Sequence, residues 1–154
     1  MTAPERLADQ IRRAVHGPAW HGPSVREALE GITVAQAARR HDGAHTIWEI
    51  VLHIDVWQRV ALRRLRGDAF EPTAEEDWPM PPRLDEPGWT DTLAGLDAGT
   101  DALTTAIAHL PASRLEEPVP GKPYALGMML MGVPQHAAYH AGQIVVLRKR
   151  HTAA

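Results

Sequence analysis

Residues 124–150 read YALGMMLMGVPQHAAYHAGQIVVLRKR, and this stretch decides the fold class. Its apolar side chains recur every three or four residues, which is the spacing of one face of an α-helix. Pro134 either kinks this helix or marks where its regular part begins. The stretch therefore predicts one long helix. Its inward side chains are Leu126, Met129, Leu130, Val133, Ile144 and Leu147.

Three other segments have the same helical periodicity. One covers residues 5–15, a second begins at the capping box Thr46-Ile47-Trp48-Glu49 and ends at Gly67, and a third covers residues 90–110. No window shows the apolar and polar alternation of a strand. Four helices with one apolar face each pack most simply as a four-helix bundle. We therefore predict an all-α fold in which residues 1–154 form a single domain, with the helix topology left open.

The segments between these helices are long, and their sequence indicates that they are ordered. Ser24-x-x-Glu27 and Thr33-x-x-Gln36 each match the capping box that begins a short helix. Prolines, which break helix interiors, gather in residues 72–87 and 111–123. We expect a four-helix bundle with long ordered connections.

The composition excludes several classes of protein. The 154 residues carry 16 Lys and Arg against 19 Asp and Glu, a formal charge of −3, and 44% of them are hydrophobic. The chain is therefore neither disordered nor a polycation that binds nucleic acid. Without cysteine it has no thiolate ligand or nucleophile, so any thiol must come from a ligand. With no signal core and no apolar stretch of ~20 residues, we expect a cytoplasmic protein without a membrane partner.

Three histidines are candidate ligands of a metal ion. His136 and His140 are one helical turn apart, so both imidazoles face the same side and lie within the apolar stripe. His53 lies beside the apolar stripe of the helix that follows Thr46. Three neutral imidazoles on two facing helices would make an open site for Zn²⁺ or Ni²⁺, with a position left for water or substrate. The alternative is that these are core histidines satisfied by hydrogen bonds.

Glu49 has two interpretations. It precedes His53 by four residues and could orient that ring by accepting its second N–H, as outer carboxylates of metal sites do. It also completes the capping box with Thr46, which alone explains a glutamate there. The spacing differs from the Glu-x-x-His motif of di-iron carboxylate proteins, so a ferritin-like centre is disfavoured.

Four more side chains are candidates for the surroundings of the site. Gln143 shares the face of the helical histidine pair, where it either holds a bound water or a ligand N–H, or caps a backbone carbonyl. Tyr139 faces either the pocket or a neighbouring helix. His45 and His21 lie in connections, and they would reach the metal end only if those connections fold over it.

Aromatic and basic residues suggest two further features. Trp78 and Trp89 flank the proline-rich connection and could wall a substrate pocket, whereas Trp48 and Trp57 are expected in the core or an interface. The run Arg63-Arg64-Leu65-Arg66 would suit an anion site, but such a run is more typical of a solvated helix end.

Two segments together resemble a known family. HTIWEIVLHI at residues 45–54 and QHAAYHAGQI at residues 135–144 look like the signature segments of the DinB/YfiT-like superfamily, and WHGPS at residues 20–24 is also similar. The resemblance covers nearly the whole chain. It implies a four-helix bundle, a homodimer and a divalent metal site near one end of the bundle. The implied ligands are His53, His136 and His140.

The resemblance also implies classes of reaction. Characterised relatives include metal-dependent S-transferases and isomerases that use bacillithiol, mycothiol or glutathione. We therefore expect a metal-dependent enzyme that activates a low-molecular-weight thiol for a small-molecule substrate, with Zn or Ni as the metal and Fe or Mn as the other candidates. One alternative is a metal-dependent hydrolase that uses a metal-bound water. The other is a non-catalytic interaction or stress-response bundle.

Overall fold

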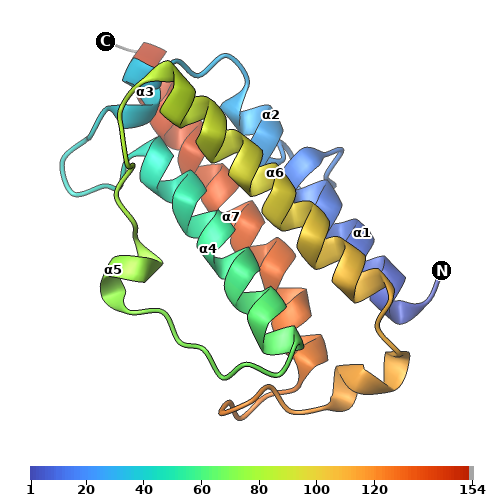
Figure 1. Ribbon diagram of the computed structural model, residues 1–154. Helices are drawn as coiled ribbons and strands as arrows, with labels where there is room; N and C mark the ends of the chain where they lie inside the picture. Colours follow the sequence, from blue (N-terminus) through green and yellow to red (C-terminus); the bar gives the residue numbers. More distant parts are fainter. Residues whose placement is uncertain (153–154) are drawn as a thin grey trace.

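The computed structural model describes residues 1–152, and four long helices form its body (Figure 1). They are α1 (Ala3–His16), α4 (Ile47–Leu65), α6 (Glu86–Ala108) and α7 (Leu126–Thr152). Residues 1–152 contain no β-strand, only two isolated bridges. The prediction of an all-α fold is confirmed. None of the described helices combines the length and apolar character that a membrane crossing needs.

Short helices occupy the connections. They are α2 (Val25–Leu29), α3 (Val34–Ala38), α5 (Ala74–Asp77) and the 3-10 helix η1 (Ala112–Glu116). The capping boxes at Ser24 and Thr33 begin α2 and α3 as the sequence predicted. A further capping box, between Thr73 and Glu76, begins α5 within the proline-rich segment, where the prolines indicated only a break between helices.

The long helices pack as a closed ring of four. The most extensive contacts join α1 to α6, α6 to α4, α4 to α7 and α7 to α1, so α1 lies across from α4 and α6 lies across from α7. Figure 1 shows that α4 and α6 run in one direction and that α1 and α7 run in the opposite direction. The ring places α4 beside an antiparallel α7, and these two helices carry the three candidate ligands.

Two helix boundaries differ from the prediction. Helix α6 begins at Glu86 rather than near residue 90, because Asp85 accepts a hydrogen bond from the Gly88 N–H and Pro87 lies in the first turn, where no N–H is needed. Helix α7 begins at Leu126 rather than 124, since the Tyr124 carbonyl accepts from Val119 in a turn before the helix. Pro134 lies inside α7, which continues through it.

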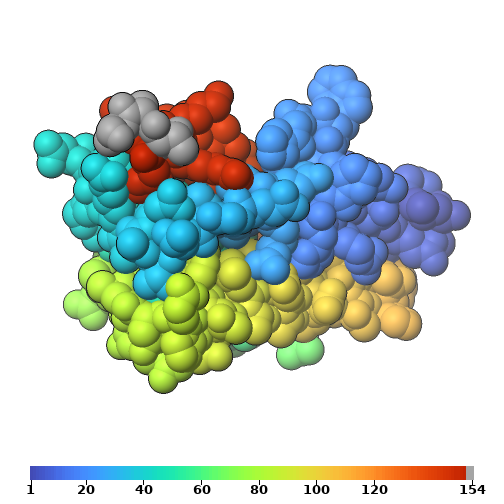
Figure 2. Space-filling model, turned by 90° about the horizontal axis from the view of Figure 1, so that it is seen from above, coloured from blue at the N-terminus to red at the C-terminus, as the bar shows by residue number. Residues whose placement is uncertain are grey.

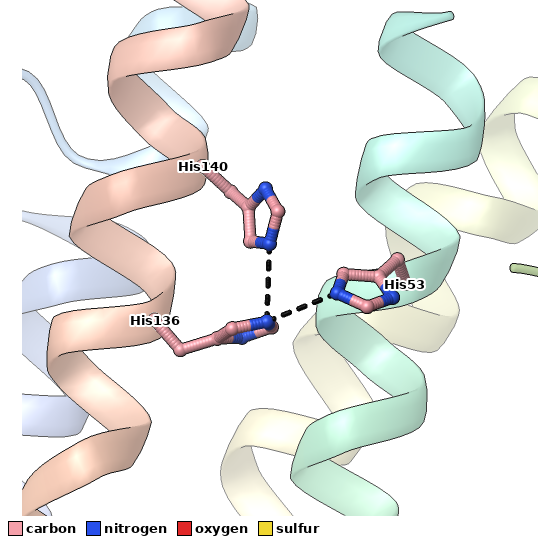
Figure 3. A group of neighbouring side chains, drawn as sticks. All are labelled: His53, His136 and His140. Carbon is pink, nitrogen blue, oxygen red and sulfur yellow. Dashed lines mark hydrogen bonds between the residues drawn. The ribbon is translucent and has the colours of Figure 1, made fainter. Parts of the chain in front are cut away.

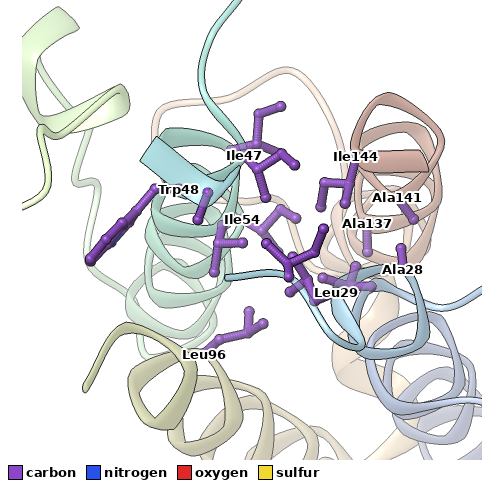
Figure 4. Packing of buried hydrophobic residues seen from close by; sticks show 14 of the residues in the cluster. Ala28, Leu29, Ile47, Trp48, Ile54, Leu96, Ala137, Ala141 and Ile144 are labelled. Carbon is purple, nitrogen blue, oxygen red and sulfur yellow. The ribbon is translucent and has the colours of Figure 1, made fainter. Parts of the chain in front are cut away.

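The apolar core has two parts along the ring. One lies toward the end where α4 begins, and it includes Ile47, Trp48, Ile54, Leu96 and Ile144 (Figure 4). Burial of each such large side chain stabilises the fold by about 1.5–3 kcal/mol. The other part is formed by buried residues of α1, α4, α6 and α7. It includes Ile11, Leu65, Leu103, Ile107, Leu126 and Leu130.

The connection that contains α2 and α3 closes one end of the molecule. Figure 2 shows this blue to cyan segment running between the end of α7 in red and the start of α6 in yellow-green. Arg148 of α7 donates a hydrogen bond to the Ala28 carbonyl of α2 at 3.2 Å. This contact and the packing of α2 on α7 fix the helix that carries two of the three histidines.

Candidate metal centre

Three histidine side chains converge between α4 and α7. Nε2 of His136 lies 3.0 Å from Nε2 of His53 and 3.0 Å from Nε2 of His140 (Figure 3). His53 and His140 are buried and His136 is half-buried. The facing helices therefore bring together the three residues that the sequence singled out, each with one nitrogen directed at a common point.

The opposite nitrogens of two rings are held by neighbouring oxygens. Nδ1 of His53 donates to the Asp77 carbonyl at 2.7 Å, and an oxygen of the Asp77 carboxylate lies 3.1 Å from the same nitrogen. Nδ1 of His140 donates to Oε1 of Gln143 at 2.6 Å. A hydrogen bond of this kind fixes both the tautomer and the orientation of a metal-ligating imidazole. Asp77 and Gln143 are thus the residues that aim the two rings.

All three rings are neutral at neutral pH. Burial, followed by the neighbouring His140 and His53, lowers the pKa of His136 from the usual 6.5 to about 3. Burial also lowers the pKa of His53 and the pKa of His140. Metal ions bind the neutral imidazole, so these rings need no deprotonation before binding.

A single proton does not satisfy this arrangement. Because Nδ1 of His53 and Nδ1 of His140 carry the hydrogens, Nε2 of each neutral ring presents a lone pair. A hydrogen on Nε2 of His136 can point at one of these lone pairs and leaves the other unpaired. A divalent cation accepts three imidazole lone pairs at once. The donor set therefore fits a metal ion.

Two tryptophans and Asp77 form a wall beside His53. The Trp78 ring stacks on the His53 ring at 3.8 Å between centroids and 6° between planes, and stacks on His45 at 3.6 Å and 4°. Trp57 Nε1 donates to Oδ1 of Asp77 at 2.6 Å. Trp78 therefore packs on one candidate ligand, but it is not among the residues that line the cavity between α4 and α7. Sequence reasoning missed Asp77, although the Thr73-x-x-Glu76 capping box directly before it signals an ordered segment.

Glu49 caps its helix and does not orient His53. Its carboxylate accepts from the Thr46 N–H at 2.8 Å, forms an ion pair with Arg40 and lies 3.5 Å from Nδ1 of His45. Burial raises the pKa of Glu49, but the bonds from Thr46 and Arg40 outweigh burial and lower it overall. The capping alternative is therefore correct. Asp77, which is 24 residues from His53, takes the orienting position because the α5 segment folds against α4.

The other sequence candidates lie at different distances from the three rings. Gln143 contacts His140 directly, and its Nε2 donates to the Tyr139 hydroxyl at 3.4 Å. The Tyr139 ring lies 5.0 Å from the His140 ring, with most of the side chain exposed. His45 is separated from His53 by the Trp78 ring. His21 is exposed in the connection after α1, and its described interactions do not include the three histidines.

A cavity of about 250 Å³ lies between α4 and α7, and His136 is part of its lining. Trp57 also lines it, so this side chain belongs to the pocket rather than to the core alone. The prediction of a solvated helix end at residues 63–66 is wrong for Arg64. Its side chain is 3% exposed and lines the cavity, because its position on α4 faces α7 while Arg63 and Arg66 face solvent.

These observations define an all-α protein with a candidate three-histidine metal centre between two antiparallel helices. The sequence model of the DinB superfamily matches residues 20–144, a range that contains all three histidines. The chain belongs to the DinB superfamily, as the resemblance in sequence indicated. No match was found among curated proteins or among solved structures.

Proposed function

We propose that the protein binds one divalent metal ion through His53, His136 and His140 and uses it to activate a low-molecular-weight thiol. The observation that carries the metal site is the pairing of convergent Nε2 atoms with anchored Nδ1 atoms. Imidazole donors suit Zn²⁺ and Ni²⁺, which are the proposed ions, with Fe and Mn as the other candidates.

The bound metal would supply one chemical effect, which is to lower the pKa of a coordinated thiol so that the nucleophilic thiolate is present at neutral pH. The protein groups do the positioning. Asp77 and Gln143 hold the rings of His53 and His140 in the required tautomers. Trp57 and Trp78 cover the His53 side of the site with apolar surface, which limits the access of water.

The lining of the adjacent cavity favours thiol activation over hydrolysis. Among the described residues, those that line it include no carboxylate, and its titratable groups are His136, Arg64 and Tyr124. A hydrolase needs a positioned group that donates a proton to the leaving atom, and the only neutral hydroxyl donor among the described lining residues is Tyr124, whose oxygen lies beside Arg64. A thiolate that attacks an electrophile has less need of such a group. Since the chain has no cysteine, the thiol is a separate small molecule.

The test of this proposal measures thiol consumption. Untagged protein loaded with Zn²⁺ or Ni²⁺ is mixed with glutathione and 1-chloro-2,4-dinitrobenzene, and thioether formation is followed by absorbance. We expect a rate that requires the metal, is lost in His53→Ala and persists in the matched control His41→Ala. Hydrolysis of 4-nitrophenyl acetate without any thiol would instead support the hydrolase. If neither reaction occurs with metal-loaded protein, the non-catalytic bundle becomes the better account.

We also propose that the protein acts on a small-molecule substrate and forms a homodimer. Four large apolar side chains are exposed on α7, and they lie within about 80° of one another around the helix. They are Met128, Met131, Tyr139 and Val146. This face supports the homodimer, and sedimentation velocity with and without metal measures it.

A further inference from the structure

We propose that the cavity between α4 and α7 binds a small carboxylic acid with an apolar body, and that Arg64 binds its carboxylate. The opposite end of the acid would then lie at His136, which borders the same cavity. That last step rests on the proposed function, because it makes the bound acid a substrate of the metal centre. The carboxylate site itself is carried by residues at the other end of the cavity.

Arg64 is a buried cation with unused donors. Its side chain is 3% exposed. Nε donates to the Phe70 carbonyl at 3.2 Å, one terminal nitrogen donates to Glu71 at 2.8 Å, and the other lies 3.5 Å from the Tyr124 hydroxyl. A guanidinium has five N–H groups, so these contacts leave two of them free. Burial of a charged group with free donors is costly unless a ligand completes its bonding.

The charge around Arg64 is positive overall. The carboxylate of Glu71 forms ion pairs with both Arg64 and Lys122, so one anion is shared between two cations. Glu71 is exposed, whereas Arg64 lies on the cavity wall. An anion inside the cavity would balance the remaining charge where water is scarce. Arginine suits a carboxylate in particular, because its planar fork matches the two oxygens.

Gln58 supplies an independent second observation. The side chain is 1% exposed and lines the cavity, and its Nε2 atom is buried without a hydrogen-bond partner. Its Oε1 atom lies 2.9 Å from the Thr100 hydroxyl, whose one hydrogen is shared between this oxygen and the Leu96 carbonyl at 2.8 Å. An unpaired buried amide N–H₂ costs about 1–3 kcal/mol, and native structures seldom leave one without a reason. Because this nitrogen is covered by protein, a ligand oxygen would pair with it only after the amide turns toward the cavity.

The dimensions of the cavity limit the acid. The Trp57 ring lies 6.2 Å from the His136 ring, and Arg64 is seven residues further along α4, which is two turns or about 10.5 Å. A volume of about 250 Å³ is below the ~300–1,000 Å³ of drug-sized ligand sites and above the ~150 Å³ that holds benzene. Met129, Val133 and Trp57 give the middle an apolar lining. The acid therefore has one ring or a short chain.

The experiment compares an acid with its uncharged amide. Calorimetry measures the binding of 4-phenylbutyrate and of 4-phenylbutanamide to the full-length protein, first without metal and then with Zn²⁺. We expect the wild type to bind the acid about 10-fold or more tightly than the amide, as for hydrogen bonds to charged groups. In Arg64→Met this ratio falls to about one, because both ligands then lack a charged partner. The matched control Arg63→Met keeps the wild-type ratio.

The paired ligands separate binding from structural loosening. If Arg64 only ties down residues 70 and 71, Arg64→Met weakens the acid and the amide equally and the ratio persists, which overturns the proposal. Failure of the wild type to prefer the acid also overturns it. Should Arg64→Met not fold, Gln58→Leu is decisive, with an expected loss of about 2- to 12-fold in affinity for the acid. Acid binding is first measured without metal, so it can be interpreted even if the three histidines bind no metal ion. In the same way, the metal-dependent thiol reaction can be interpreted even if the cavity binds no acid.

Discussion

Two groups of histidines lie close together in this molecule, and they differ in what surrounds them. The rings of His53 and His136 are 4.9 Å apart, and the rings of His41 and His151 are 5.1 Å apart. The first group also includes His140. In this group the Nδ1 atoms of His53 and His140 are anchored by hydrogen bonds, and their Nε2 atoms face a common point. In the second group, Nε2 of His41 and both nitrogens of His151 are buried without a well-aligned hydrogen-bond partner, although the Gln36 backbone lies close enough to raise the pKa of His151.

The comparison shows that close packing of imidazoles does not by itself make a ligand set. Burial lowers the pKa of His151 as it lowers the pKa of His136, so each of these two rings is neutral at neutral pH. The distinguishing feature is the outer partner that fixes which nitrogen carries the hydrogen. Asp77 and Gln143 provide it at the candidate metal centre, and the comparison can be tested by changing the surroundings of each ring.

The largest effect is expected for the anchor of His140. Gln143→Ala removes the acceptor of the Nδ1 hydrogen and frees the ring to rotate, so metal affinity should fall by about 10- to 100-fold. Competition with a chromophoric chelator measures the change. Gln135→Ala is the matched control, since Gln135 is an exposed glutamine of the same helix, and its affinity should equal that of the wild type. Equal affinities for both variants would show that the anchor has no role.

Without metal, the folded protein is expected to lose stability as the solution becomes acidic. The pKa of His136 is about 3 in the folded protein and 6.5 in the unfolded chain, so between these values the unfolded state binds the extra proton. The contribution of the neutral His136 ring to the free energy of unfolding is therefore fully present above pH 6.5 and is lost as the pH falls. Between pH 7 and pH 5 the loss is about 2 kcal/mol. The free energy of unfolding, measured with urea at pH 7 and at pH 5, should fall by about 2 kcal/mol less in His136→Leu than in the wild type. Equal falls in the two proteins would contradict this expectation.

The smallest effect is expected for the stacked ring. Trp78→Leu removes the aromatic face that holds His53, and an aromatic pair contributes about 0.5–1.5 kcal/mol, so metal affinity should fall by about 2- to 12-fold. Trp20→Leu, at a fully exposed tryptophan, is the control and should have no effect. An unchanged affinity in Trp78→Leu would mean that Asp77 alone positions the ring.

Local signals in the sequence predicted much of the fold and the three converging histidines. The Thr46 capping box fixed where α4 begins, because both of its hydrogen bonds lie within four residues. The spacing of His136 and His140 placed both rings on one face, since helix geometry depends on the backbone alone. His53 was found beside an apolar stripe, which is also a local pattern.

The surroundings of the site depend on contacts between distant segments, which no local pattern contains. Asp77 and Trp78 reach His53 because the four-residue helix α5 folds back on α4, within a segment whose prolines indicated only a break. Arg64 was interpreted as solvated because a run of arginines is usually exposed. Its burial follows from the packing of α7 against that turn of α4, where Tyr124 lies beside the guanidinium.

The metal content of the purified protein is the most direct test of the three-histidine centre. Untagged wild type, His136→Ala/His140→Ala and His41→Ala/His151→Ala are purified in parallel and analysed by elemental mass spectrometry. We expect about one equivalent of a divalent metal in the wild type and in the His41/His151 variant, and none in the His136/His140 variant. The metal centre is ruled out if the wild type neither contains metal nor binds added Zn²⁺ or Ni²⁺. Its ligand set is wrong if the His136/His140 variant retains the metal.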